Sequence, residues 1–469
     1  MTFQERELSI LREAIDKADE ERSRKLVNTP EIKRMIEIVE RFLRSKKLIC
    51  YGGTAINNIL PVSERFYDYN LQIPDYDFFS KSAMDDAKEL ADIYAKEGFA
   101  NVQAKAGQHF GTYKVFVDFT PIADVTQLDH KIFNNLWKSS VRVNGIHYAP
   151  PDYLRMGMYL ELSRPAGDVS RWEKMLKRLI LLNKNYPMKT GVCQNYDILQ
   201  RDYSEGNANE EKLYNITQES LIHQGVVFFG GFAGFMFSKF MPKKVRKQFS
   251  KSPDFDVLSK NPKETATILK ESIEYADFKN VKVIKHDGIG EVIPKHYEVR
   301  VGKDTVAFIY EPLACHSYNT IKVRGTTVKI ATIDTILSLY LAFLYAGKAY
   351  YEPERIMCMA ALLFDVQKRN RLSQKGILKR FPIECYGRQE TIESIRAEKA
   401  EKFEELKNKK NSREYEMWFL NYQPESKEKR NTKGKVKKTS KRRKSTKGGR
   451  IRNRTIKHST RKRVIRKYK

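Results

Sequence analysis

The sequence Leu48-Ile49-Cys50-Tyr51-Gly52-Gly53-Thr54, followed by Pro74-Asp75-Tyr76-Asp77, decides the fold. The apolar residues before the glycines predict a short buried strand, and the glycines end it before a helix that we expect from Ala55 to Leu60. Residues two apart on a strand face the same way, so Asp75 and Asp77 should project together. The pattern predicts a strand, a turn and a helix beside a pair of carboxylates.

The same phrase occurs a second time, as Gly230-Gly231 followed by Asp254-Phe255-Asp256. Asp254 follows Asp75 by 179 residues, and other landmarks keep nearly the same offset, which indicates a duplicated domain. Matching Pro312 to Pro121 needs an offset of 191, so we expect a local insertion there. This alignment sets Ile309 opposite Asp118 and Cys315 opposite Asp124, and it predicts a second copy without a third carboxylate.

Composition limits the class of protein. A chain of 469 residues with 41% hydrophobic content is long enough for two or three domains. The five cysteines show no spacing typical of a zinc site or a disulfide framework, which favours a reducing compartment. No stretch predicts a signal peptide, and the longest apolar run, residues 225–237, is too short to span a bilayer. We therefore expect a soluble intracellular protein with no membrane partner.

The positive charge is concentrated at one end. Residues 426–469 contain 22 Lys or Arg against one acidic residue, Glu428, and so hold +21 of the net charge of +29. A segment with so few apolar residues cannot bury a core, and we expect a disordered basic tail. Binding to nucleic acid, a localisation signal and a solubility tail all fit such a charge run.

These observations predict an α/β (α+β) fold with two tandem duplicated domains, in which helices flank mixed sheets and the second copy is degenerate. The expected domains are a catalytic domain with N-terminal helices over residues 1–190, a degenerate copy over 191–385, a charged helix over 386–425 and the basic tail over 426–469.

A third carboxylate from the neighbouring strand would complete a site for two divalent metal ions in phosphoryl transfer. Magnesium is the expected ion, because it prefers oxygen ligands. We select Asp118, within Phe116-Val117-Asp118-Phe119, as the third ligand. Asp124 is the rival, because it lies at an even separation from Asp118, but Pro121 argues against a continuous strand between them.

The Gly-Gly turn suits a triphosphate. Gly52 and Gly53 allow the backbone to approach phosphates closely, and the Thr54 hydroxyl and the helix N-terminus add donors. A Gly-Gly pair alone is usually only a tight turn, and Asp-x-Asp alone is usually a loop. The two motifs together, in this order, favour a catalytic site.

The motifs resemble the polymerase-beta-type nucleotidyltransferase signature. The strings Tyr51-Gly52-Gly53-Thr54-Ala55-Ile56, Pro74-Asp75-Tyr76-Asp77-Phe78-Phe79-Ser80 and Pro151-Asp152-Tyr153 through Arg171-Trp172-Glu173-Lys174 are similar to poly(A) polymerase catalytic subunits of large nucleocytoplasmic DNA viruses. The resemblance covers roughly residues 30–380 and omits the tail.

The resemblance implies template-independent addition of AMP from ATP to the 3′ end of viral mRNA. It implies that Asp75, Asp77 and Asp118 hold two Mg²⁺ or Mn²⁺ ions and that Gly52, Gly53 and Thr54 meet the triphosphate. Lys174, Arg178 and Arg171 are candidates for the outer phosphates, since the metals alone leave charge unbalanced. A solvated basic helix face explains these three equally well.

The resemblance also implies a homodimer, viral transcription or capping proteins as partners, and a location in the cytoplasmic virus factory and the virion. Two other functions stay open. The carboxylates do not choose a base, so the enzyme could add UMP instead. The chain could also be an inactive RNA-binding protein on this fold.

Overall fold

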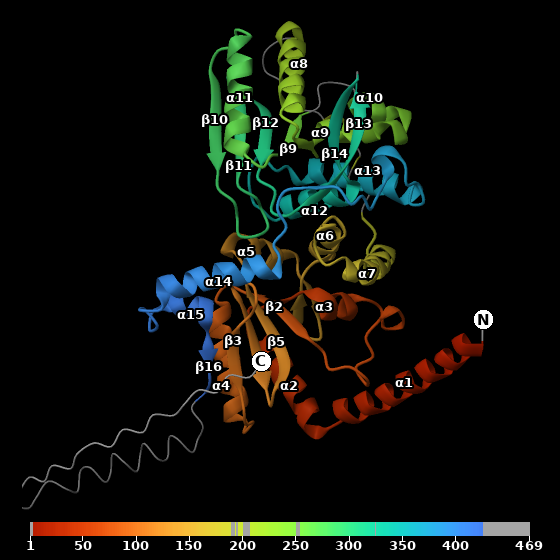
Figure 1. Cartoon of the computed structure of the whole chain (residues 1–469), viewed down its shortest axis with the longest axis vertical. Coiled ribbons are helices and arrows are strands. Elements are labelled where there is room, and N and C mark those ends of the chain that lie inside the picture. Colours follow the sequence, from red (N-terminus) through yellow and green to blue (C-terminus); the bar gives the residue numbers. More distant parts are fainter. Residues whose placement is uncertain are drawn as a thin grey trace, which may run out of the picture. The chain divides into compact units, whose positions relative to one another are not determined.

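The computed structural model describes residues 3–188, 193, 196–199, 207–249, 254–323 and 325–424, and Figure 1 shows the arrangement of its helices and strands. The predicted basic tail, residues 426–469, lies outside the described residues. The described part contains two mixed sheets of eight strands each, flanked by helices. The predicted fold class is confirmed.

The first sheet has the strand order β16-β3-β4-β5-β2-β1-β7-β6. Its strands are β1 (Ile49–Cys50), β2 (Tyr76–Ser80), β3 (Gln103–Ala106), β4 (Thr112–Val117), β5 (Thr120–Gln127), β6 (Val141–Val143), β7 (Ile146–Tyr148) and β16 (Asn421–Tyr422). The helices of this half are α1 (Phe3–Val27), α2 (Pro30–Ser45), α3 (Gly52–Ile59), α4 (Ala83–Lys96), α5 (His130–Ser139), α6 (Pro151–Leu162) and α7 (Trp172–Asn185).

The second sheet has the order β10-β11-β12-β9-β8-β14-β13-β15. Its strands are β8 (Val227–Phe228), β9 (Phe255–Leu258), β10 (Val281–His286), β11 (His296–Val301), β12 (Asp304–Tyr310), β13 (His316–Val323), β14 (Thr326–Ala331) and β15 (Cys385–Tyr386). The later helices are α8 (Asn207–His223), α9 (Gly231–Phe237), α10 (Lys243–Phe249), α11 (Pro262–Tyr275), α12 (Ile333–Phe343), α13 (Pro353–Arg369), α14 (Ile392–Leu406) and α15 (Arg413–Phe419).

The two sheets repeat one topology. Seven strands follow the same order in each, with antiparallel and parallel pairs in the same places. The offset is 179 residues between Asp75 and Asp254 and 184 between Thr112 and His296. The insertion therefore lies before β11, in the connection that follows β10. The offset of 191 that matched Pro312 to Pro121 is wrong, because the strand register does not pair them.

Helices cover one face of the first sheet near its centre. Thr29 caps α2, since its side chain accepts a hydrogen bond from the Ile32 amide, and Pro30 opens the helix. On β4, Tyr113, Val115 and Val117 are buried, while the alternate residues are half-buried. Helix α4 packs on the buried face, so the opposite face of β4 is free to carry polar side chains.

A two-residue turn separates β4 from β5. Asp118 and Phe119 both have positive φ, of 45° and 65°, and the chain reverses there. Pro121 then lies where the β4–β5 register shifts, which is an irregularity that tolerates proline in a strand. Pro121 therefore does not prevent Asp124 from lying on a regular part of β5.

The segment after the second sheet returns to the first. Helix α14 begins at Ile392 inside the predicted charged stretch, and β16 pairs with β3 at the outer edge of the first sheet. The Tyr113 hydroxyl donates to the Met417 carbonyl at 3.0 Å, and the rings of Phe110 and Trp418 lie 4.3 Å apart. Residues 386–424 thus contain the predicted charged helix, as α14, and they also add α15 and the edge strand β16 to the half of the chain that holds the first sheet.

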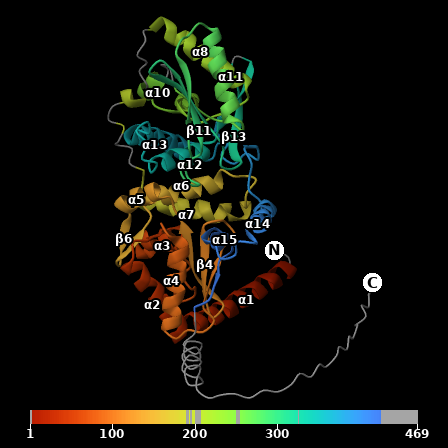
Figure 2. The same ribbon diagram turned by 90° about the vertical axis from the view of Figure 1, so that its left-hand side faces the viewer.

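The halves also contact each other directly. Helices α6 and α12, which are equivalent in the repeat, lie side by side in both views (Figures 1 and 2). The Ser317 amide donates to the Ser163 carbonyl at 2.8 Å, and the Asn135 side chain donates to the Tyr345 carbonyl at 2.9 Å.

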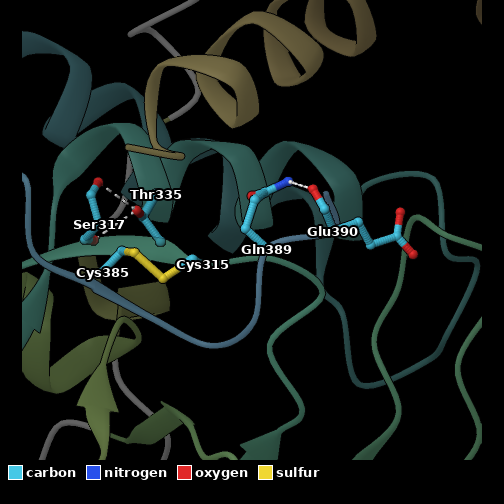
Figure 3. The surroundings of a disulfide bond; sticks show 6 residues. All are labelled: Cys315, Ser317, Thr335, Cys385, Gln389 and Glu390. Carbon is cyan, nitrogen blue, oxygen red and sulfur yellow. Dashed lines mark hydrogen bonds between the residues drawn. A yellow bond between two sulfur atoms is a disulfide. The ribbon is translucent and has the colours of Figure 1, made fainter. Parts of the chain in front are cut away.

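Four of the five cysteines form disulfides. Cys193 bonds to Cys358, and Cys315 bonds to Cys385, with Cα atoms 5.1 Å apart in each pair. Figure 3 shows the second bond beside Ser317, whose hydroxyl lies 3.3 Å from that of Thr335. The expectation of unpaired cysteines is wrong for these four, because partners 165 and 70 residues apart leave no local spacing signal. The cysteines therefore do not support a reducing compartment.

Among the helices of the described residues, none combines the length and the apolar character that crossing a bilayer requires.

Candidate active site

The Gly-Gly turn is packed against the acidic strand. Gly52 has a φ of +72°, and a Cβ atom there would lie 2.5 Å from Asp77 Oδ2. A Cβ atom on Gly53 would lie 2.5 Å from the Tyr67 hydroxyl and 2.9 Å from Arg178 Nη1. The positive φ favours glycine at position 52, and both glycines let the turn lie close between the carboxylate and the guanidinium.

Thr54 has a structural role. Its hydroxyl donates to the Asp75 backbone carbonyl at 2.6 Å, and its side chain is buried. The hydroxyl proton is therefore engaged by the backbone in this structure, and a contact between Thr54 and the triphosphate stays a prediction. Thr54 fixes the backbone that presents Asp75. No side chain caps α3, so its first backbone amides stay without a side-chain acceptor.

Asp124, and not Asp118, completes the acidic group. Strands β2 and β5 are parallel neighbours, and Asp77 is the register partner of Asp124. Asp118 lies exposed in the β4–β5 turn, where the Asn101 side chain approaches it at 3.4 Å. The structure does not bring Asp118, the predicted third ligand, to the other two acids, because β4 ends at Val117 and the chain turns back there.

The carboxylates repel each other. The pKa of Asp77 is raised from 3.8 to about 7, first by burial and then by the negative charges of Asp75 and Asp124. The pKa of Asp75 is also raised, by desolvation and the charge of Asp124. Lys114, the register partner of Asp124 on β4, forms an ion pair with it and lowers this repulsion only in part.

The donor set fits hard divalent cations. All three side chains offer oxygen ligands, the kind that Mg²⁺ and Mn²⁺ prefer. The pKa values of Asp75 and Asp77 are raised first by burial and then by the neighbouring carboxylates, a penalty that a bound cation would relieve. Within residues 3–424 as described, no three acidic, histidine or cysteine side chains are already gathered for a metal. In the observed arrangement Asp124 is instead ion-paired with Lys114.

Protonation of Asp77 should make stability depend on pH. Its pKa is higher in the folded protein than the ordinary 3.8, so ionisation disfavours the folded state. The neutral Asp77 carboxyl therefore favours the folded state. This contribution to stability is complete below pH 3.8 and is lost as the pH rises through about 7. In metal-free buffer we expect Asp77→Asn to raise the free energy of unfolding at pH 8 by about 2 kcal/mol, a value reduced for partial exposure. Thermal melting of both proteins at pH 5 and pH 8 measures this, and an equal Tm difference at the two pH values would contradict it.

Three cations from one helix region face the site. The Arg178 guanidinium lies 4.7 Å from the Phe66 ring centre and 5.3 Å from that of Tyr67, and it donates to the Tyr67 hydroxyl at 2.5 Å. The pKa of Lys174 is lowered, first by the charge of Arg178, then by burial and by Arg171. In the described residues neither Lys174 nor Arg178 has a carboxylate partner, whereas Arg171 lies 3.7 Å from Glu161. Such crowded positive charge favours the binding of an anion.

The second copy of the site is closed. Arg355 on α13 corresponds to Lys174 on α7, since Glu354-Arg355-Ile356 aligns with Glu173-Lys174-Met175. Arg355 forms an ion pair of 2.9 Å with Asp254, the counterpart of Asp75, and both side chains are buried. An internal cation thus takes the position that the first copy leaves for ligands.

The register also shows what replaced the third acid. Asp256 is the register partner of Phe308, and Phe308 is the register partner of Glu298. These three residues occupy the positions that Asp77, Asp124 and Lys114 have in the first copy. The counterpart of Asp124 is therefore Phe308, and the alignment with Cys315 is wrong, as is that of Ile309 with Asp118. The prediction that this copy lacks a third carboxylate at this position is confirmed.

The buried pair gives a second prediction. Asp254→Asn leaves the Arg355 charge buried without its ion-pair partner, so we expect a loss of about 3 kcal/mol in the free energy of unfolding. Urea unfolding measures this loss, with the exposed Asp277→Asn as a control. An equal free energy of unfolding in Asp254→Asn and Asp277→Asn would contradict the role of the buried ion pair.

Sequence reasoning missed Lys114, Phe66 and Tyr67. Alternation along β4 could have placed Lys114 on the face of Asp124 once the turn was known. Phe66 and Tyr67 lie in an irregular connection, where no periodicity marks them.

Known proteins resemble the segment of the chain that contains this site. Residues 37–168 match the family model described as "Poly(A) polymerase catalytic subunit". The putative poly(A) polymerase catalytic subunit of African swine fever virus is 35% identical over 167 residues, which cover 34% of this chain and 35% of that protein. The protein of the same description from Acanthamoeba polyphaga mimivirus is 30% identical over 161 residues, 33% of this chain and 27% of that protein.

The likeness in sequence thus spans only about a third of the length of these curated relatives. A solved structure, that of the Megavirus polyadenylate synthase, superposes on 93% of this chain and 90% of its own, with a TM-score of 0.74 and 20% identity. At that identity it shows the fold alone. The chain therefore has the fold of this polyadenylate synthase along nearly its whole length, and its sequence resembles poly(A) polymerase catalytic subunits in the segment that contains Asp75, Asp77 and Asp124.

Proposed function

We propose that this chain is a poly(A) polymerase that adds AMP from ATP to the 3′ end of viral mRNA without a template. The observation that carries the proposal is the register pair of Asp77 and Asp124 beside Asp75, with the Gly52-Gly53 turn between these acids and Arg178. Acidic ligands on one side and unpaired cations on the other suit a nucleoside triphosphate bound through divalent ions. The family match over residues 37–168 supports the same reaction.

In this reaction the 3′ hydroxyl oxygen of RNA attacks the α-phosphorus of ATP, and the bond to pyrophosphate breaks. Asp75, Asp77 and Asp124 would hold two Mg²⁺ or Mn²⁺ ions, which supply charge neutralisation and a more acidic hydroxyl when bound. Gly52 and Gly53 let the phosphates approach the start of α3. Lys174 and Arg178 would neutralise the outer phosphates as charge builds on the leaving pyrophosphate.

The test is an extension assay with a single-stranded oligoribonucleotide, magnesium and one nucleoside triphosphate at a time. We expect extension with ATP at a rate well above that with UTP, CTP or GTP. Preferred use of UTP would show a uridylyl-adding enzyme, which is the alternative that the carboxylates alone permit. Binding of RNA with no extension by any nucleotide would instead show an inactive RNA-binding protein.

Assembly and location rest on the resemblance alone. We propose a homodimer that works with viral transcription or capping proteins in the cytoplasmic virus factory and is packaged in the virion. Light scattering on the purified protein tests the dimer, and a monomer at micromolar concentration would contradict it.

A further inference from the structure

The open face of the first sheet continues from the carboxylates toward its outer edge. Asp77, Asp124, Lys114 and Lys105 form one register row across β2, β5, β4 and β3, so their side chains share a face. Lys105 is exposed, and its Nζ lies 5.8 Å from the ring centre of Phe116, the half-buried residue two places after Lys114. The acids thus give way to basic and aromatic side chains along the sheet.

The β4–β5 turn adds an exposed aromatic ring at the same end of the sheet as the acids. Asp75 directly precedes β2, and Tyr76 is the partner of Ala123, so Asp75 lies level with Ile122. Phe119 is three residues before Ile122, about 10 Å along the strand direction at 3.3 Å per residue. Its side chain is 81% exposed. Among the described residues it makes no ring contact that would explain an aromatic residue there.

Phe119 also has an unfavourable backbone conformation. Both turn residues have positive φ, which a tight hairpin accepts readily only from Asn, Asp or Gly, and a bulky residue there is strained. Strain of this kind persists at sites where function requires the side chain. An aromatic ring that costs stability and makes no internal contact points to an external ligand.

The second copy lacks every one of these features. Its equivalent turn is Gly302-Lys303, where glycine supplies the positive φ of 60° without strain. Ile284, Glu298 and Arg300 occupy the positions of Lys105, Lys114 and Phe116. The copy without the third acid therefore has neither the aromatic tip nor the basic pair, so the repeated fold itself does not require them.

We propose that Lys105, Phe116 and Phe119, here called the aromatic strip, bind the single-stranded 3′ region of the RNA, with a base stacked on Phe119. The inference rests on the proposed function and deepens it. Basic side chains that follow a backbone, interleaved with aromatic rings, are typical of single-strand binding. Stacking accepts every base, which suits a strand whose sequence before the tail varies. A duplex buries its base faces and would not use an exposed ring in this way.

The main test replaces Phe119 by glycine, which creates an Asp-Gly turn. This change relieves strain, so we expect a Tm equal to or above that of the wild type. We expect the Kd for a short fluorescent oligoadenylate, measured by anisotropy, to rise about tenfold, with an equal rise in KM for the RNA and no change in KM for ATP. Opposite effects on stability and binding exclude simple misfolding.

Matched variants sharpen the test. Phe119→Trp should keep the affinity, because indole also stacks. Tyr275→Ala removes a 93% exposed ring from the second half and should change nothing. Lys105→Ala should weaken binding for every sequence and reduce the slope of log K against log salt by about one.

The outcomes separate the two proposals. Extension by the wild type with an unchanged Kd in Phe119→Gly overturns the aromatic strip and leaves the polymerase. Binding that depends on Phe119 without extension leaves the strip and overturns the polymerase. Competition by polyglutamate as strong as that by oligoadenylate would show a surface for any polyanion, and it would overturn the stacking role.

Discussion

Asp124→Asn is expected to reduce the rate of RNA extension at least about 10³-fold. In the proposed reaction Asp124 would help to hold the metal ions, and its loss would remove several kcal/mol of transition-state stabilisation. Asp118→Asn is expected to retain nearly full activity. Asp124 is the register partner of Asp77, whereas Asp118 is exposed in the β4–β5 turn. Single-nucleotide addition under single-turnover conditions measures both rates.

The pair is a matched control, since both changes replace one carboxylate by its amide in the same hairpin. Asn also tolerates the positive φ of 45° at position 118, so that variant should fold normally. Asp124→Asn removes the ion-pair partner of Lys114, and thermal melting must show that the protein stays folded. Full activity of Asp124→Asn together with an inactive Asp118→Asn would restore Asp118 as the third ligand and refute the site described above.

The contrast between these two residues shows how far sequence patterns reach. Period-two alternation correctly placed Asp75 and Asp77 together, since it needs only one strand. The third acid depends on which residues of β5 lie opposite β2, and a turn of Asp118-Phe119 without glycine or asparagine gives no signal of where β5 begins. Register between strands is long-range information. Pro121 argued against placing Asp124 on the strand, because the local sequence does not reveal the register irregularity that accommodates the proline.

Other misses have the same cause. The duplicated Gly-Gly and Asp-x-Asp phrases predicted two equivalent sheets, which the shared strand order confirms. The replacement of Asp124 by Phe308 could not be read, because insertions shifted the alignment by several residues. The Cys193–Cys358 bond joins residues 165 apart, and only the folded chain brings them together.

Lys174→Ala is expected to lower kcat/KM for ATP about 10²-fold to 10³-fold while the Kd for RNA stays unchanged. A cation aimed at developing phosphate charge contributes more in the transition state than in the ground state, so kcat should fall as well as KM rise. The pKa of Lys174 is lowered first by the charge of Arg178, then by burial and by Arg171, so a bound anion would relieve repulsion among these cations. In the second copy the counterpart of Lys174 is Arg355, which contacts Asp254, the counterpart of Asp75. This contact supports the inference that Lys174 is directed toward the site.

The same helix provides the control. Lys177 is exposed and forms an ion pair of 2.6 Å with Glu173, so Lys177→Ala removes an equal charge from α7 without touching the cluster. Arg178→Lys keeps the charge but loses the bond to Tyr67 and the stacking on Phe66, and it should also impair ATP use, because lysine cannot replace a stacked guanidinium. A readout without turnover is the rise in Tm caused by ATP, which should shrink in Lys174→Ala and persist in Lys177→Ala. An equal loss of the ATP-induced rise in Tm in Lys174→Ala and Lys177→Ala would mean that α7 presents only a solvated basic face. The triphosphate would then have to be held by the metal ions and the start of α3 alone.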